Sequence, residues 1–503
     1  MTILRYILIG LEVVLLFNLL IGVHELGHFL AAKWRGLKIE RFAIWFGKPI
    51  WKKKIGGVEY ALGWIPAGGY VALPQMATME IIEGKGKHAS EPPKEVVVPW
   101  HDFPAGGTSD TEHPEEVLPN VSALDKIIVA FAGPLFSFAL AIFFAVVVWG
   151  VGKPSNEADN TTTIGWVTPK DANGNPAPAW QAGLRPGDTI LEVDGHPVKY
   201  FAPPALDSVT WRIVTSEGTN IAIKYLRDGK EDIAYAVPYH RPTQWYERKD
   251  LRHILIAPVM KAVIDQMASN SPAALAGLTS GDEIIALDGK KIYSPLAVFS
   301  AEDEMSNSPV RPLTLTVRRG NEEFDRTLLA AKPIQPTNSN PSLGILVWGQ
   351  ETNETLTHPS PLEQIQSSIG QITGTIRALF AHKSDIGVQQ LGGAVMIIRV
   401  YSNLFDSDDG WRRVLWFSVI LNVNLALINM LPLPVLDGGH ILLSLLEVVR
   451  RRPVSARVLN AIQTGFAMLL ITFMLYIAFF DTGDWLRSAR AEREQPIIFA
   501  PNK

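Results

Sequence analysis

Leu15-Leu16-Phe17-Asn18-Leu19-Leu20-Ile21-Gly22-Val23-His24-Glu25-Leu26-Gly27-His28 stands near the start of the chain. Histidines four residues apart lie on one face of a helix, so both imidazoles can bind one zinc ion. Glu25 lies beside them, where it can take a proton from an attacking water. A helix with a solvated polar face is the alternative, and the apolar residues on both sides of the motif argue against it. Ionisable groups in such a span are costly unless paired or bound to metal, so the motif indicates a functional site.

Four apolar stretches are long enough to cross a bilayer, which takes about 20 helical residues. They run near residues 6–32, 127–150, 414–433 and 459–480. The first is too long and too continuous for a signal peptide and lacks a small-residue cleavage site, so we expect it to be a retained helix. The expected fold class is therefore a polytopic α-helical membrane protein with four transmembrane helices.

Composition limits the chemistry that is available. Of the 503 residues, 47% are hydrophobic, which indicates both membrane and water-exposed parts. The net charge is −4 and no basic excess is present, so no nucleic-acid partner is expected. Cysteine is absent, so a metal ion must be bound by histidine or carboxylate side chains.

Basic residues predict the orientation in the membrane. They cluster after the first stretch and between the third and fourth, at Lys33, Arg35, Lys38, Arg41, Lys48, Lys52, Lys53 and Lys54, and at Arg450, Arg451, Arg452 and Arg457. Cytoplasmic loops are enriched in Lys and Arg, so both loops are placed in the cytoplasm. Both termini and residues 153–411 then lie in the periplasm or outside the cell; Arg412 and Arg413 oppose this but are outnumbered. We expect an inner-membrane protein with its active site near the cytoplasmic face.

The outer segment contains a repeated pattern. Residues 182–195 read AGLRPGDTILEVDG and residues 276–289 read AGLTSGDEIIALDG. Two copies of about 90 residues are expected, at 155–250 and 255–335. The matched spacing argues against the alternative of two unrelated turn-rich β segments.

This repeat resembles the PDZ family in the circularly permuted form of bacterial proteases, which implies two α+β domains. Its glycines suit turns that need positive φ, and each Asp-Gly pair suits a hairpin. Alternating apolar residues at 221–225 and 313–317 predict strands that follow each copy. Extracytoplasmic peptide ends are candidate ligands of such domains.

The rest of the chain divides around these features. Residues 1–150 form an N-terminal membrane part, within which residues 73–119 are rich in Pro, Gly and charge and are assigned no fold beyond a cytoplasmic insert. Residues 336–411 are interpreted as a linker with an amphipathic segment. Residues 412–483 form a C-terminal membrane part, and residues 484–503 form a tail.

Two histidines leave a catalytic zinc ion one protein ligand short of three. The best candidate is Asp437, in the run Asn429-Met430-Leu431-Pro432-Leu433-Pro434-Val435-Leu436-Asp437-Gly438-Gly439-His440. Two prolines should break the helix here, which membrane proteins tolerate beside a cavity. Asp437 could instead be a turn aspartate before Gly-Gly. His440 could be a rival ligand, but we interpret it as structural.

These motifs together resemble the site-2 protease family of intramembrane zinc metalloproteases, most closely the four-span bacterial regulator-of-sigma-E type with PDZ domains. The resemblance implies that Zn²⁺ is the cofactor, with ligands His24, His28 and Asp437, and that Glu25 is the catalytic acid and base. It implies that substrate is held by Asn429, by Asn424 and by the prolines of the broken helix, Pro432 and Pro434.

Residues 65–70 read IPAGGY, and with Gly68 and Gly69 they resemble the family's re-entrant β-hairpin, expected at about residues 40–72. In the family this hairpin is thought to pair with an extended substrate strand. Two departures stand out. Ser137 occupies a position where relatives often carry asparagine, so it is given no catalytic role, and the insert at 73–119 is longer than expected.

The predicted function is cleavage of transmembrane segments of membrane proteins within the lipid bilayer. The resemblance implies an anti-sigma factor or a remnant signal peptide as substrate, and no residue chooses between them. One alternative is a noncatalytic membrane PDZ scaffold that binds extracytoplasmic chain ends, which would not need His24, Glu25, His28 and Asp437 in lipid. Another is a transporter, which the small number of spans disfavours.

Overall fold

The computed structural model describes residues 3–74, 76, 121–155, 160–202, 205–306, 308–336, 339–349, 355–407, 409–450, 456–491 and 497–501. The insert predicted at 73–119 lies almost entirely outside these residues. Two compact units are present, one formed by residues 1–143 and 418–472, the other by residues 144–417 and 473–503.

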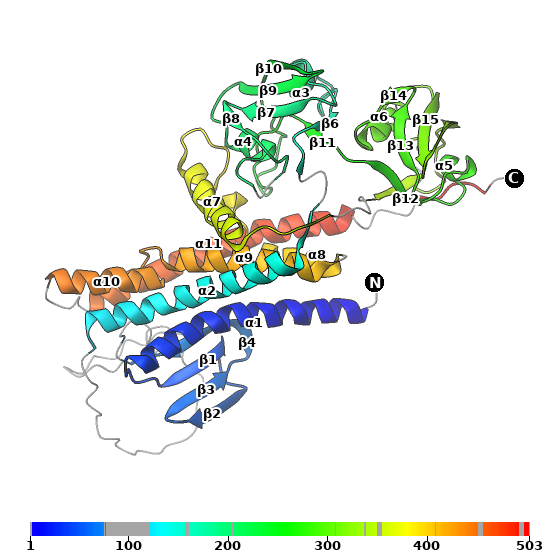
Figure 1. The fold of residues 1–503 in the computed structure, drawn as a ribbon. Coiled ribbons are helices and arrows are strands. Elements are labelled where there is room, and N and C mark those ends of the chain that lie inside the picture. The colour runs from blue at the N-terminus through cyan, green and yellow to red at the C-terminus, as the bar shows by residue number, and fades with distance from the viewer. Residues whose placement is uncertain are drawn as a thin grey trace. The chain divides into compact units, whose positions relative to one another are not determined.

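Four helices in the described part of the chain are long and apolar enough to cross a membrane, which agrees with the four predicted stretches. They are α1 (Ile3–Trp34), α2 (Ala123–Val151), α9 (Gly410–Asn429) and α11 (Ala456–Ala491) (Figure 1). Apolar side chains cover all sides of these helices, as expected where lipid replaces water. The chain is a multi-pass membrane protein.

A four-stranded sheet follows α1 and lies beside its C-terminal half (Figure 1). Its strands are β1 (Arg41–Phe46), β2 (Trp51–Ile55), β3 (Val58–Leu62) and β4 (Ile65–Ala72), in the order β2-β3-β1-β4. β1 pairs parallel with β3 and antiparallel with β4. The structure thus has a four-stranded sheet where the sequence suggested one hairpin. This sheet shares a core with the end of α1 through Phe29, Leu37 and Val71.

The helix of the third span ends before the two prolines, as the sequence predicted, and a new helix begins after them. α9 ends at Asn429, and α10 (Asp437–Arg450) begins after seven intervening residues, with Asp437 as its first residue. The connection packs tightly on the start of α10. A Cβ added at Gly438 would lie 2.3 Å from the Met430 carbonyl oxygen, and one at Gly439 would lie 2.0 Å from that of Leu433. Only glycine permits this packing, which fixes where Asp437 lies.

The second unit contains two β domains with the same order of elements. The first has β6 (Ile164–Val167), α3 (Pro178–Gln181), β7 (Thr189–Val193), β8 (His196–Pro197), α4 (Val209–Thr215), β9 (Ile221–Arg227), β10 (Lys230–Ala236) and β11 (Ile256–Pro258). The second has β12 (Ala262–Met267), α5 (Pro272–Leu275), β13 (Glu283–Leu287), β14 (Lys290–Lys291), α6 (Leu296–Glu304), β15 (Pro312–Arg319), β16 (Glu322–Leu329) and β17 (Ile345–Gly349). The strands predicted at 221–225 and 313–317 lie in β9 and β15.

The domain boundaries differ from those predicted. The last strand of each domain pairs with its first, β11 with β6 and β17 with β12. β11 therefore belongs to the first domain, although the predicted boundary fell before it. β17 belongs to the second domain, although it lies beyond residue 335. Long-range antiparallel pairing sets these limits, and local sequence patterns do not reveal it.

The segment after the second domain is mostly helical. β18 (Thr355–Thr357) pairs with β5 (Lys153–Ser155), so the chain ends that enter and leave the pair of β domains lie side by side. Two helices follow, α7 (Pro361–Phe380) and α8 (Ala394–Asp406), joined by a segment with the short helix η3 (Val388–Gln390). Ser360 and Glu363 form a capping box that begins α7.

The glycines of the repeat adopt the predicted backbone. Gly187 and Gly281, at matching positions, have φ of +96° and +92°. Asp194-Gly195 turns between β7 and β8, and Asp288-Gly289 turns between β13 and β14, which confirms both Asp-Gly hairpins. Positive φ at both turn residues is the geometry such pairs favour.

Each domain also repeats an ion pair between a buried aspartate and a more exposed arginine. Asp188 accepts from Arg227 through Nε at 2.6 Å and Nη2 at 2.7 Å, and Asp282 accepts from Arg319 with the same two distances. Both aspartates are almost fully buried. Burial raises the pKa of Asp282, but hydrogen bonds from Arg319 and the Thr279 backbone outweigh it and hold this pKa below its ordinary value.

We predict that Asp282→Asn lowers the free energy of unfolding of the second β domain by about 1–2 kcal/mol at neutral pH, because a bidentate charge-assisted pair is lost. The folded pKa is depressed, so this stabilisation is present above the ordinary aspartate pKa of about 3.9 and is lost as pH falls through the lower folded value. Urea unfolding between pH 2 and 7 measures it. Asp325→Asn, at an exposed position on β16, is the control. Equal loss in both variants would contradict the role of the pair.

Candidate metal centre

Three potential ligands converge in the first unit. His24 Nε2 lies 3.2 Å from Asp437 Oδ2, His28 Nε2 lies 3.4 Å from Asp437 Oδ1, and the two imidazole Nε2 atoms are 3.3 Å apart. The ligand atoms of all three residues lie within 4.8 Å of one another. Each residue is at most 9% exposed. Two imidazoles and a carboxylate in a buried cluster fit a zinc ion.

The other ring nitrogens of both histidines contact α2. His28 Nδ1 lies 2.7 Å from the Val129 carbonyl oxygen, and His24 Nδ1 lies 3.0 Å from Ser137 Oγ. A carbonyl only accepts, so His28 Nδ1 carries the proton and its Nε2 keeps a lone pair for a metal. Ser137, for which no catalytic role was expected, contacts His24 and orients its ring. No local pattern around Ser137 could have indicated this contact.

Two glycines allow α1 and α2 to approach closely at the site. A Cβ added at Gly133 would lie 2.2 Å from His28 Nε2, and one at Gly27 would lie 2.4 Å from the Ala132 carbonyl oxygen. Small residues at such crossings permit tight backbone contact between membrane helices. The glycine within the HExxH motif and Gly133 therefore decide how His28 is held. Sequence reasoning missed both roles.

Glu25 lies beside strand β4. A Cβ added at Gly69 would lie 3.1 Å from Glu25 Cγ, and Gly68 has φ of +75°. A side chain at Gly68 would also overlap the Phe46 ring. Glu25 Oε2 is buried and has no hydrogen-bond partner among the described residues. A buried carboxylate oxygen without a partner, beside three potential metal ligands, is suited to accept a proton.

The three potential ligands and Glu25 all line one cavity of about 2190 Å³ in the first unit. Gly68, Gly69, Asn429 and Pro434 line it too, so these predicted substrate-binding residues lie with the cluster. Asn424 and Pro432 are not among the lining residues, and Pro432 is exposed. His440 lines the cavity but is not part of the three-residue cluster found among the described residues.

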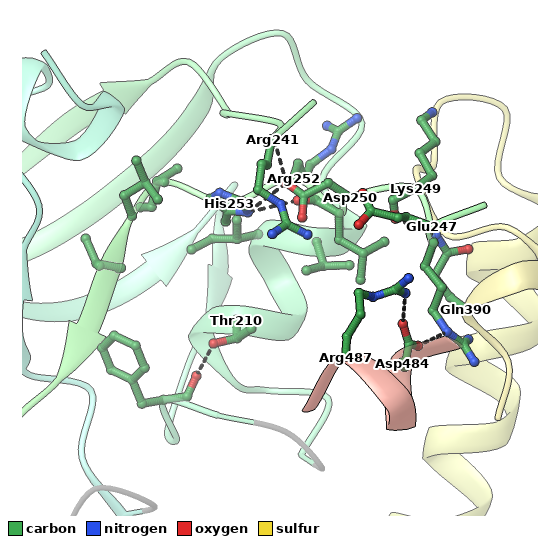
Figure 2. A pocket seen from close by; sticks show the side chains of 18 residues that line it. Thr210, Arg241, Glu247, Lys249, Asp250, Arg252, His253, Gln390, Asp484 and Arg487 are labelled. Carbon is green, nitrogen blue, oxygen red and sulfur yellow. Dashed lines mark hydrogen bonds and ion pairs between the residues drawn. The ribbon is translucent and has the colours of Figure 1, made fainter. Parts of the chain in front are cut away.

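A second cavity, of about 560 Å³, lies in the second unit (Figure 2). One wall is formed by Thr210, Ile213 and Val214 of α4, and another by residues 247–256. Asp484 and Arg487 at the end of α11 also line it, and Figure 2 shows them paired. An apolar helix face beside charged groups can bind a peptide.

Ionic contacts hold the segment next to this second cavity. Arg252 Nε donates to Asp385 at 2.8 Å, and His240 Nε2 lies 2.7 Å from the same carboxylate. Burial raises the pKa of Asp385, but His240 and Arg252 lower it more, so this pKa lies below its ordinary value. Asp385 therefore stays ionised and links the first β domain to the α7–α8 connection.

Known proteins resemble the chain over most of its length. Peptidase family M50 matches residues 12–473. A regulator of sigma E protease from Haemophilus influenzae is 28% identical over 480 residues, which cover 92% of this chain and 96% of that protein. The protease RseP from Yersinia pestis is 26% identical, with 92% and 96% covered. A Vibrio cholerae protein named as a zinc metalloprotease is 27% identical, with 88% and 91% covered. The chain, a multi-pass membrane protein and zinc metalloprotease, thus belongs to peptidase family M50.

Proposed function

We propose that this metalloprotease cleaves transmembrane segments of other membrane proteins, with zinc held by His24, His28 and Asp437 and with Glu25 as the acid and base. The observation that carries the proposal is the buried cluster of three ligands beside Glu25. Two of the ligands and Glu25 lie on a helix apolar enough to span a membrane. Such residues are costly in lipid unless they act together.

The zinc ion would polarise the scissile carbonyl and lower the pKa of the attacking water. Glu25 takes the proton of that water through its free Oε2, as the oxygen attacks the carbonyl carbon. Glu25 then delivers the proton to the leaving amine when the C–N bond breaks. Ser137 and the Val129 carbonyl keep both imidazoles oriented throughout.

A helical substrate must unwind before its peptide bond can react, and the freed backbone groups need partners. β4 forms one edge of its sheet, and Gly69 on this strand lies against Glu25. An extended substrate can add to this edge by β-augmentation, next to the acid and base. We propose that Gly68 and Gly69 allow this approach and that Asn429 and Pro434 contact the bound strand. Asn424 and Pro432, which do not line the cavity, would act on substrate only through the shape of the broken helix.

We further propose that the sheet and the loop after α10 face the cytoplasm of the cell's inner membrane, and that the two β domains lie outside. The exposed lysines Lys52, Lys53 and Lys54 on β2 support this orientation. The β domains are proposed to be PDZ-like. From the resemblance to site-2 proteases of the regulator-of-sigma-E type, we propose an anti-sigma factor or a remnant signal peptide as the substrate class.

The sequence also suggested a noncatalytic scaffold as an alternative function. The second cavity, with the apolar face of α4 on one side, supports binding of peptide ends. A scaffold gives no reason for the buried histidine and aspartate cluster, so we favour the protease.

We predict that Glu25→Gln lowers cleavage of a transmembrane reporter at least about 100-fold while zinc remains bound, because glutamine cannot accept the proton. Turnover in proteoliposomes and metal content of the purified protein are the measurements. Glu12→Gln, on an exposed position of the same helix, is the matched control. Activity of Glu25→Gln near that of the control would exclude the mechanism.

For Asp437→Asn we predict loss of both activity and zinc retention, because the third ligand becomes a neutral amide. His440→Asn, in the same cavity and on the same helix, should keep its zinc. Zinc content after dialysis against a chelator separates the two variants. Should the His440 variant lose zinc and the Asp437 variant keep it, the ligand assignment would be wrong.

The β domains are proposed to act as a size filter that excludes substrates with bulky outer parts. β5 and β18 pair, so residues 164–349 can be removed and the neighbouring strands joined by a short linker. We predict that this deletion keeps zinc bound and permits cleavage of untrimmed substrates that the intact enzyme cuts only after trimming. Matched trimmed and untrimmed substrates are compared in membranes. Loss of trimmed-substrate cleavage with zinc retained would instead identify the domains as a receptor for chain ends.

A further inference from the structure

Gln463 brings an amide from α11 to the wall of the cavity that contains the metal centre. Gln463 is only 6% exposed, whereas the preceding residue, Ile462, is 49% exposed. A polar side chain turned inward from a membrane helix is costly unless its groups find partners. The hydrogen bonds of this amide therefore need an explanation.

One end of the amide has a partner and the other has none. Gln463 Nε2 donates to the Pro434 carbonyl oxygen at 3.3 Å. Because that carbonyl can only accept, the contact fixes which end of the amide is nitrogen. The remaining atom, Oε1, is buried and has no hydrogen-bond partner in the described part of the chain. Unpaired buried acceptors are rare in folded proteins, so this oxygen needs an explanation, and a bound partner is one.

Oε1 of Gln463 shares this condition with Oε2 of Glu25, and both side chains line the same cavity. The bond to Pro434 also ties Gln463 to the broken segment that precedes Asp437. The amide thus contacts the segment that precedes the third ligand and also lines the cavity in which substrate would react.

An extended peptide exposes backbone groups along two edges. If one edge pairs with β4, the N–H groups on the other edge still need acceptors, which the surrounding lipid does not supply. The wall formed by α11 can supply one such acceptor, and a side-chain amide does so whatever the sequence of the strand.

We propose that Gln463 is a substrate-binding residue whose Oε1 accepts a backbone N–H of the unwound substrate while Nε2 remains on Pro434. This inference rests on the proposed proteolytic function. It assigns the C-terminal membrane helix a part in binding the substrate strand. α11 would contact one edge of that strand, and β4 would pair with the other. Because the contact is made to backbone, it changes affinity and leaves sequence preference unaltered.

The first test replaces the amide by an apolar side chain of similar length. Gln463→Met should raise KM for a transmembrane reporter about fivefold, the factor that corresponds to one neutral hydrogen bond, with zinc content unchanged. Ile462→Met, on the exposed side of the same turn, should leave KM unchanged. A wild-type KM for Gln463→Met with zinc retained would overturn the proposal.

The second test detects contact directly and does not require turnover. The chain contains no cysteine, so Gln463→Cys or Ile462→Cys introduces the sole thiol. Each is combined with Glu25→Gln and oxidised mildly with a reporter that carries one cysteine beside the scissile bond. Disulfide formation should be at least fivefold greater at position 463. Equal disulfide formation at both positions overturns the proposal for Gln463. Turnover by the Glu25→Gln variant would instead refute the proposed catalytic mechanism, and the comparison of disulfide yields would still stand.

Discussion

The burial of two imidazoles and a carboxylate among apolar helices is the constraint on which the first unit depends. His24, His28 and Asp437 are each at most 9% exposed, and lipid offers no water to compensate them. The Nδ1 atoms of the two histidines have partners on α2, Ser137 for His24 and the Val129 carbonyl for His28. The opposite nitrogens face one another and the carboxylate. The polar groups are thus paired on one side and left for a metal on the other, which is the arrangement that makes such burial tolerable.

Close backbone approach makes this arrangement sterically feasible. Gly27 and Gly133 allow α1 to lie against α2, Gly69 allows β4 to pass Glu25, and Gly438 allows the broken segment to fold onto α10. Each of these positions would place a Cβ within about 3 Å of a neighbouring atom, which folded proteins avoid. A site assembled from four separate elements therefore depends on small residues as much as on its polar ones.

Much of the site could be predicted because its strongest signals are local. Helix geometry places the two histidines on one face beside the glutamate, the two prolines near Asp437 indicate a helix break, and the Asp-Gly pairs of the repeat indicate tight turns. The rest depends on pairing between distant segments. The parallel pairing of β1 with β3, the return of β17 to β12, and the contacts of Ser137 and Gln463 have no local pattern, because their partners lie far away in the sequence.

In the second unit, charged side chains join separate elements, whereas close backbone packing joins them in the first unit. Asp481, near the end of α11, is 4% exposed, pairs with Arg248, and accepts from the backbone N–H of Gly393 at 3.0 Å and Met396 at 3.2 Å at the start of α8. One carboxylate thus joins the segment after β10, the first turn of α8 and the C-terminal membrane helix. Buried ion pairs add little net stability compared with apolar packing, and in some proteins they select one arrangement over others. The proposed filtering of substrates would need the first β domain in a defined position on α11, and the contacts of Asp481 with Arg248 and with the start of α8 supply one.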